Sequence, residues 1–254
     1  MAEGDTILRT ARRIEAALGG QELSVLAGNG RGRAAGVERL DGRALERVEA
    51  RGKHLLLRCD DLVLHSHLGM SGSWHVYRRG DRWRKPASAA WVILGGEELE
   101  AVQFGGPTLR VMTAGQLRRD PVLTRLGPDV LAEGFDPGDG IDALRASPGR
   151  ELGDALLDQH AIAGIGNIFK SEACFAAGAN PWCPVAELSD DELRETLDAA
   201  RRLMRESVAS GRPSPAVYRR AGQPCPSCGT PIAAHGQGDA NRRTYWCPRC
   251  QATG

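Results

Sequence analysis

The sequence predicts an α+β protein with a β-rich N-terminal part, a helical part after it and a small metal-bound hairpin at the C-terminus. Three observations carry this prediction. Short β-like runs fill residues 21–115, apolar positions return with helical spacing from about residue 150, and two Cys-x-x-Cys pairs lie near the C-terminus. With 254 residues, 41% of them hydrophobic, the chain is long enough for two domains, or for one domain with an appendage.

The N-terminal residues predict one helix followed by a series of strands. Thr6 suits the N-cap of a helix over 6–18, an apolar stripe follows, and Gly19 and Gly20 end it. Short runs punctuated by Gly, Asp and Pro then predict strands at Glu22–Leu26, Glu46–Ala50, His54–Cys59, Leu62–His67, Ser73–Tyr77, Ala90–Leu94, Leu99–Gln103 and Leu109–Met112. Strands this short and this closely spaced are typical of an antiparallel sandwich or barrel.

The second half predicts a connection and then helices. Residues 117–149 are rich in Gly, Pro and Asp, which indicates an inter-domain connection. Helical spacing predicts three helices, which are Glu151–Gln159, Ile168–Ala177 with Asn167 as its cap, and one from the capping box Ser189–Glu192 to Gly211. Gly164-Ile165-Gly166 breaks the chain between the first two.

Two cysteine pairs near the C-terminus have the spacing of a metal site. They are Cys225, Cys228, Cys247 and Cys250, with eighteen residues between the two pairs. A two-residue spacer lets both thiolates of a pair reach one ion at about 2.3 Å, and two pairs complete a tetrahedron. Two disulfides or four unrelated thiols are the alternatives. Because four thiolates fill every position, the pattern predicts one structural Zn²⁺ with no open catalytic position.

The segment around these cysteines is basic. From Gly211 to the end there are six arginines and one acid, Asp239, and Asn241–Trp246 reads as a basic and aromatic strand. A tetrathiolate zinc site subtracts two charges, so the segment remains about +3. A metal-rigidified basic hairpin indicates contact with nucleic-acid phosphates.

The whole chain, by contrast, is not a polycation. Its net charge is +1, so a nucleic-acid surface must come from sorting charges between faces. The acidic start, Met1–Asp5, lacks the apolar region of a signal peptide, and no apolar run approaches the length of a membrane span. Three cysteines, Cys59, Cys174 and Cys183, are left over, which argues against a secreted disulfide scaffold. We therefore expect a cytoplasmic protein with no membrane contact.

Several local patterns leave alternatives open. Gly164–Asn167 offers either a phosphate site at a helix N-terminus or a helical corner without a ligand. Lys53 alone is more often a solvated lysine, and Met70 between flexible glycines is either core or an exposed apolar wedge. His65 and His67 lie on one face of a strand, where hydrogen-bonded core histidines are favoured over a metal site because no third ligand is evident.

Taken together, these pieces resemble the formamidopyrimidine-DNA glycosylase and endonuclease VIII family over nearly the whole chain, with actinobacterial endonuclease VIII-like members nearer. The motifs that carry the resemblance are Glu3-Gly4-Asp5-Thr6, Arg51–Leu56, His67–Gly72, Leu157–Glu172, Val217-Tyr218, Gly222–Cys225 and Arg242–Gln251. The Leu157–Glu172 run and the cysteine finger are each specific.

The resemblance implies a β-sandwich domain with a flanking helix, a helix–two-turn–helix domain and a zinc finger, with kinked, damaged double-stranded DNA as the partner. We expect these at 1–116, 150–214 and 215–254, with a linker at 117–149, in a nucleoid-associated monomer. Carried over by motif, Lys53, Asn167 and Arg242 contact the phosphates at the lesion. Met70 fills the hole left by the flipped nucleotide. Glu3 opens the deoxyribose ring as a proton donor, Lys53 assists β-elimination, and Arg242 assists δ-elimination.

The sequence departs from the family at the nucleophile, which in the family is an N-terminal proline. Here Ala2 takes that position, and alanine also permits removal of Met1, so a free α-amine is expected. Its pKa of about 7.7–8.0 leaves part of it neutral near pH 7. The resemblance then implies a glycosylase and abasic-site lyase acting through the Ala2 amine, and the alternative is a catalytically weakened protein that binds damaged DNA.

Two further departures concern the lesion. The stretch Gln103–Pro107 lacks the Arg–Phe pair that family enzymes add to the wedge, and the segment before Val217, where some members carry a purine-covering loop, is short. Both departures favour oxidised pyrimidines.

Overall fold

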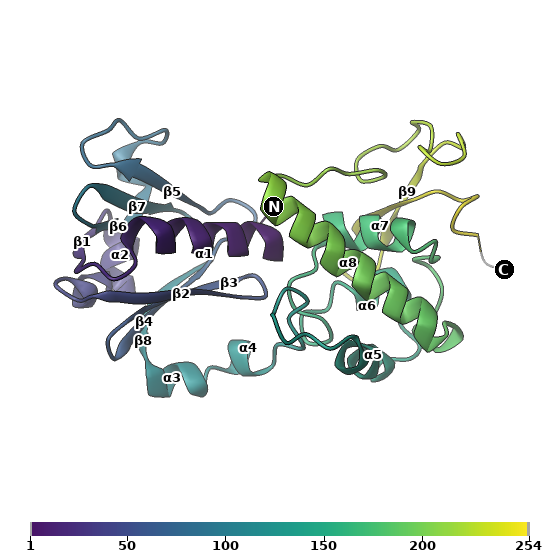
Figure 1. The fold of residues 1–254 in the computed structure, drawn as a ribbon, viewed down its shortest axis with the longest axis horizontal. Helices are drawn as coiled ribbons and strands as arrows, with labels where there is room; N and C mark the ends of the chain where they lie inside the picture. The colour runs from purple at the N-terminus through teal and green to yellow at the C-terminus, as the bar shows by residue number, and fades with distance from the viewer. Residues whose placement is uncertain (1, 253–254) are drawn as a thin grey trace. The chain divides into compact units, whose positions relative to one another are not determined.

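The structure is a computed structural model that describes residues 2–252, so the expected removal of Met1 concerns a residue outside the described range. The chain divides into two compact units, Met1–Thr124 and Arg125–Gly254 (Figure 1). The finer domain boundaries given above stay predictions. Within the described residues, every helix is too short or too polar to cross a bilayer.

The first unit begins with α1 (Gly4–Leu18), whose buried residues Ile7, Ala11 and Ile14 face the core. The helix starts earlier than the predicted cap at Thr6. The N–H of Ile7 donates to the Glu3 carbonyl at 3.1 Å, which closes the first turn, while the Thr6 hydroxyl donates to the Asp5 carboxylate at 3.2 Å. Glu3 is therefore the N-cap, which puts this acid at the head of the helix.

Two four-stranded antiparallel sheets make up the rest of the first unit. One has the order β2-β3-β4-β8 and the other β1-β6-β7-β5. The strands are β1 (Ser24–Ala27), β2 (Leu45–Arg51), β3 (His54–Cys59), β4 (Leu62–His67), β5 (Ser73–Arg78), β6 (Ala90–Gly95), β7 (Leu99–Phe104) and β8 (Thr108–Thr113). Residues of both sheets and of α1 share one hydrophobic core, which confirms the antiparallel β-sandwich with a flanking helix.

Short helices complete the first unit. They are α2 (Gly30–Ala35), α3 (Ala114–Arg118) and α4 (Pro121–Thr124), with 3-10 turns at Val37–Leu40 and Ala87–Ala89. Asp120 precedes α4, and its carboxylate Oδ1 accepts from the N–H groups of Val122 at 3.1 Å and Leu123 at 3.0 Å.

The second unit is helical. Its helices are α5 (Pro137–Arg145), α6 (Leu152–Ala155), α7 (Asn167–Ala176) and α8 (Asp190–Ser210), with a 3-10 turn at Val185–Glu187. One core unites them, and α5, which lies within the predicted connection, contributes Ile141 and Leu144 to it. The capping box at Ser189 is confirmed, and α8 ends at the positive-φ residue Gly211 as predicted.

Two details of the helical prediction were wrong. The predicted helix Glu151–Gln159 shrinks to α6, because the chain turns at Asp158, whose carbonyl accepts from Ala161 and whose carboxylate accepts from the N–H of His160. Gly166, and not Asn167, is the N-cap of α7, so Asn167 is the first helical residue. Hydrophobic spacing marks an amphipathic face but does not show where local polar groups end a helix.

The C-terminal part of the second unit is a two-stranded antiparallel hairpin, β9 (Ala233–Gln237) and β10 (Arg242–Trp246). Val217, Ile232 and two of the finger cysteines form a small core beside it. This core is too small to hold the hairpin alone, which explains why the segment also carries a metal site.

Candidate metal centre and nucleic-acid interface

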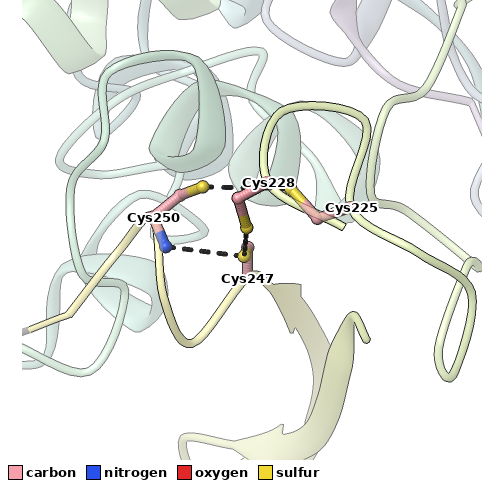
Figure 2. A group of neighbouring side chains, drawn as sticks. All are labelled: Cys225, Cys228, Cys247 and Cys250. Carbon is pink, nitrogen blue, oxygen red and sulfur yellow. Dashed lines mark hydrogen bonds between the residues drawn. The ribbon is translucent and has the colours of Figure 1, made fainter. Parts of the chain in front are cut away.

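The four finger cysteines converge as the spacing predicts. Their Sγ atoms lie within 4.8 Å of one another, and Figure 2 shows the four side chains turned toward a common point. Cys225 and Cys250 are separated by 3.9 Å between sulfurs, and Cys228 and Cys247 by 3.4 Å. These distances are far from the ~2.05 Å of a disulfide. They bracket the ~3.8 Å between sulfurs that follows from a tetrahedron with Zn–S bonds of about 2.3 Å.

Backbone groups support the thiolates. The N–H of Ser227 donates to Cys225 Sγ at 3.4 Å, and the N–H of Cys250 donates to Cys247 Sγ at 3.5 Å. Hydrogen bonds to sulfur stabilise negative charge there, as a metal-bound thiolate requires. The site is a structural Zn²⁺ site with four cysteine ligands, and it is the only metal-ligating group of three or more such side chains found among residues 2–252.

The hairpin of β9 and β10, which we call the zinc hairpin, is hydrogen-bonded to α7 through β10. Asn167 Nδ2 donates to the Arg243 carbonyl at 2.9 Å, and the N–H of Tyr245 donates to Ser171 Oγ at 3.4 Å. Asn167 Oδ1 is buried and has no hydrogen-bond partner in the described protein. Arg242 begins β10 and is exposed. Asn167 and Arg242, predicted as phosphate ligands from sequence positions far apart, thus belong to two directly bonded elements of one unit.

A buried polar chain fastens the hairpin more deeply. Lys170 on α7 is completely buried, and its Nζ donates to Thr244 Oγ1 at 2.6 Å. The Thr244 hydroxyl donates to Gln237 Oε1 at 2.6 Å, and Gln237 Nε2 donates to a Glu151 carboxylate oxygen at 2.9 Å. Every bond runs in the same direction, from a cation to an anion, so the dipoles reinforce one another. We call Lys170, Thr244, Gln237 and Glu151 the hairpin chain.

Sequence reasoning missed the hairpin chain. Lys170 stands out only as one of three lysines among 33 basic residues. Its position on the buried face of a helix was the one available signal, because a lysine there needs a partner.

Glu172 on α7 binds the segment that precedes the zinc finger. Its carboxylate accepts from three successive backbone N–H groups, those of Ala216 at 2.6 Å, Val217 at 2.9 Å and Tyr218 at 2.7 Å. Three donors to one buried carboxylate fix the segment that enters the finger. This role explains why Glu172 belongs to a specific motif although it does not lie at a helix end.

In the first unit, the predicted catalytic residues of the N-terminus stand at the head of α1. Glu3 is 1% exposed. Ala2 is half-buried against the sandwich core, and its nitrogen lies 3.5 Å from the Gly69 carbonyl oxygen. The segment that follows Met1 is therefore bound to the β4–β5 loop and does not extend into solvent.

Lys53 and Met70 occupy two turns of the first unit. Lys53 follows Gly52, whose φ of +57° suits the first central position of a two-residue turn between β2 and β3. Met70 is 65% exposed, so it is not a core residue. Beside it, Gly69 has a φ of +56°, and a Cβ there would lie 2.8 Å from Pro107. The loop that carries Gly69 and Met70 thus packs against the Gly105–Pro107 turn.

His65 is hydrogen-bonded, as favoured, and its histidine partner is His54, whereas His67 meets His54 through a ring contact. His54 Nδ1 lies 2.9 Å from His65 Nε2, and the rings of His54 and His67 are 4.7 Å apart. Burial, followed by the neighbouring His67 and His65, lowers the pKa of His54 to about 3. Burial, followed by Arg110, lowers the pKa of His65 to about 4. The direct hydrogen bond between the ring nitrogens of His54 and His65 leaves no room for a metal ion between these two rings.

The predicted site residues therefore fall into two groups. Ala2, Glu3, Lys53 and Met70 belong to the first unit, where Ala2 meets the loop that carries Met70. Asn167, Arg242 and the four cysteines belong to the second, where α7 and the zinc hairpin join them.

Comparison with known proteins defines the class of this chain and then its nearer relatives. Three family models match in order along it, which are the formamidopyrimidine-DNA glycosylase N-terminal domain over 1–104, the formamidopyrimidine-DNA glycosylase H2TH domain over 126–217, and a zinc finger found in FPG and IleRS over 222–253. The chain belongs to the formamidopyrimidine-DNA glycosylase and endonuclease VIII family.

Among its relatives, a probable endonuclease 8 2 of Streptomyces coelicolor is 42% identical and matches 99% of this chain and 94% of its own length. A DNA-(apurinic or apyrimidinic site) lyase Nei2 of Mycolicibacterium smegmatis is 36% identical, with 99% of each chain covered. The solved structure of Lactococcus lactis Fpg with DNA containing an abasic site has a TM-score of 0.85 at 22% identity, covering 99% of this chain and 100% of that one. That similarity supports the same fold.

Proposed function

We propose that this chain is a base-excision-repair DNA glycosylase and abasic-site lyase that removes an oxidised base from duplex DNA, with pyrimidines favoured, and then cleaves the strand. The observation that carries the proposal is the N-terminus. A buried acid at the head of α1 adjoins a nitrogen held by the Gly69 carbonyl. The family and the relatives, one named as an abasic-site lyase, support the same reaction.

The reaction uses the Ala2 α-amine after Met1 is removed. The neutral nitrogen attacks C1′ of the sugar, the glycosidic bond breaks, and the base leaves with the bonding electrons and a proton. Glu3 donates a proton to the ring oxygen, the ring opens, and C1′ and the nitrogen form an imine that is protonated. Loss of a C2′ proton then expels the 3′ phosphate by β-elimination, and water releases the amine.

The remaining residues hold the DNA. Lys53, on a tight turn, supplies positive charge where the phosphate leaves. Asn167 and Arg242 grip backbone phosphate from one unit, because α7 and β10 are directly hydrogen-bonded. Exposed Met70 enters the base stack in place of the everted nucleotide.

Three features favour oxidised pyrimidines. The Gly105–Pro107 turn adds no Arg or Phe beside Met70, and the segment between α8 and Val217 is short. The S. coelicolor and mycobacterial relatives carry endonuclease 8 names.

Borohydride trapping on abasic duplex DNA tests the proposal. We expect a covalent adduct at the N-terminal peptide, abolished by acetylating the α-amine, and little strand cleavage by Glu3→Gln. Asp5→Asn is the matched control, since Asp5 is another buried acid of the same turn and the proposed reaction assigns it no step. An intact mass with Met1 attached, or no adduct, would contradict the proposal.

Ala2 itself favours a second candidate, a damaged-DNA-binding protein weakened in catalysis by the absence of the proline. The same experiment separates the two. Tight binding of abasic duplex without cleavage, with cleavage appearing in Ala2→Pro, would establish the binding function.

A further inference from the structure

A row of polar side chains crosses the β2-β3-β4-β8 sheet on the face opposite the sandwich core. Leu55, Leu57 and Leu64 point into that core, so the alternating neighbours His54 and His65 point away from it. The strand registers pair His54 with His67, and His65 with Arg110. The row lies outside the hydrophobic cluster, and yet His54 and His65 are both buried.

Hydrogen bonds join the row in a fixed order. The Arg110 guanidinium donates to the Asp120 carboxylate and, through Nε, to His65 Nδ1 at 3.2 Å. A guanidinium only donates, so His65 Nδ1 accepts and the proton of the neutral ring sits on Nε2. The His65 Nε2–H then donates a hydrogen bond to His54 Nδ1, 2.9 Å away. Asp120, Arg110, His65 and His54 therefore form a directed chain, the histidine chain, in which both tautomers are determined.

The histidine chain ends where the catalytic turns begin. His54 directly follows Lys53, and its ring lies 4.7 Å from the ring of His67. His67 ends β4 and leads into the loop of Gly69 and Met70. At the other end, Asp120 is anchored by the backbone of α4.

We propose that His65 and Arg110, acting through His54, are positioning residues for Lys53, and that this chain holds the β2–β3 turn at the distance from phosphate that binding and elimination require. The inference rests on the proposed function of Lys53. The turn has only two residues, so the backbone of His54 determines where Lys53 lies. When the His54 side chain is held by hydrogen bonds, Lys53 is held as well, and when it is not, the Lys53 ammonium group can move. Misplacement of a catalytic group by about 1 Å costs up to about a hundredfold in rate.

The chain works only with neutral rings. A proton on either imidazole would set N–H against N–H between His54 and His65, or against the Arg110 donor. The charged groups around the rings are Lys53 beside His67, Arg110 and Asp120, and both histidine pKa values lie well below 6.5. Without the Arg110 donor, His65 gains freedom to exchange tautomers and to take a proton.

A thermodynamic cycle on an abasic-site analogue tests the inference without requiring catalysis. The probe is a duplex containing tetrahydrofuran, and the variants are Lys53→Met, Arg110→Met and the pair. We expect each single change to weaken binding about tenfold, and the pair to weaken it by no more than the stronger single change, because Arg110 acts through Lys53. Arg58→Met is the matched control, since Arg58 lies on the same face and pairs with Glu49 at 3.0 Å outside the chain.

A second readout separates positioning from loss of structure. With the DNA saturated by protein, borohydride trapping at Ala2 should stay near the wild-type level in Arg110→Met, while strand cleavage slows about tenfold at pH 7.5 and further at pH 6. Nitrogen NMR of the imidazoles should show one tautomer of His65 in the wild type and mixed tautomers in the variant.

Full additivity of the two changes, or wild-type affinity and pH profile in Arg110→Met, would overturn the inference. A wild-type protein that binds the analogue but yields no adduct would overturn the lyase proposal. The inference about Lys53 would then be decided by the binding affinities of the single and double variants. A wild-type protein with no preference for the analogue would overturn both.

Discussion

Lowering the pH from about 7.5 to about 5 should destabilise the first unit by about 4 kcal/mol through His54 and His65 alone. Both rings are buried and neutral in the folded protein, with pKa values of about 3 and about 4. In the unfolded chain each has a pKa near 6.5. The unfolded state therefore binds more protons throughout this range, and stability falls as the pH falls below the unfolded value.

The magnitude follows from the distance between pH 5 and the unfolded pKa. That distance is about 1.5 units, or about 2 kcal/mol for each ring, since neither folded pKa reaches 5. The loss continues toward the folded values and is absent above about pH 7.5. A total of about 4 kcal/mol is a large part of the 5–15 kcal/mol typical of a domain.

Urea unfolding at the two pH values measures the effect, provided that the probe reports the first unit alone. The fluorine resonance of labelled Trp74 serves, because this indole is buried and donates to Ser66 Oγ at 3.1 Å. In His54→Phe/His65→Met the difference between the two pH values should be smaller than in the wild type by about 4 kcal/mol, whatever the variant's absolute stability. An unchanged wild-type free energy of unfolding, or a His65 NMR titration near pH 6, would refute the reasoning.

Three other changes have expected outcomes. Lys170→Met should cost the second unit about 3 kcal/mol in urea unfolding, because Thr244, Gln237 and Glu151 lose the cation at the end of their chain, while zinc analysis still finds one ion; a loss below about 1 kcal/mol would contradict this. Cys228→Ser should unfold the hairpin and weaken DNA binding, since zinc coordination contributes folding free energy, and an unchanged melting temperature would argue against it. Met70→Ala should leave stability within about 0.5 kcal/mol but weaken binding to abasic duplex, and equal affinity of the two proteins would remove the wedge role.

The predictable parts of the fold are those encoded by local pattern. The cysteine spacing predicted the metal centre, because two-residue spacers allow little geometry other than a shared ion. Short β-like runs bounded by Gly and Asp predicted His54–Cys59 and Leu62–His67 with the bounds observed for β3 and β4. The helix over Glu151–Gln159 failed, since Asp158 redirects the backbone through its own hydrogen bonds.

The contacts that could not be predicted join residues far apart in the sequence. Nothing in the pattern around Lys170 indicates that its partner is Thr244, 74 residues further on. His54 similarly looked like an ordinary strand residue, because its bond to His65 depends on the register of β3 and β4. Strand register and helix–hairpin packing are set by the whole core, so such partners become visible only in the folded unit.

The hairpin chain has a consequence for how this sequence can diverge. A buried cation, a buried hydroxyl, a buried amide and a half-buried carboxylate are matched donor to acceptor, so replacing Lys170 by an apolar residue leaves the buried Thr244 oxygen without the donor that this series of hydrogen bonds begins with. Descendants that lose the lysine should replace positions 151, 237 and 244 as a set. Those four positions should therefore covary among homologues, independently of the cysteines. Homologues that share one set of these residues should form one lineage, in which the zinc hairpin is held to α7 by the same hydrogen bonds.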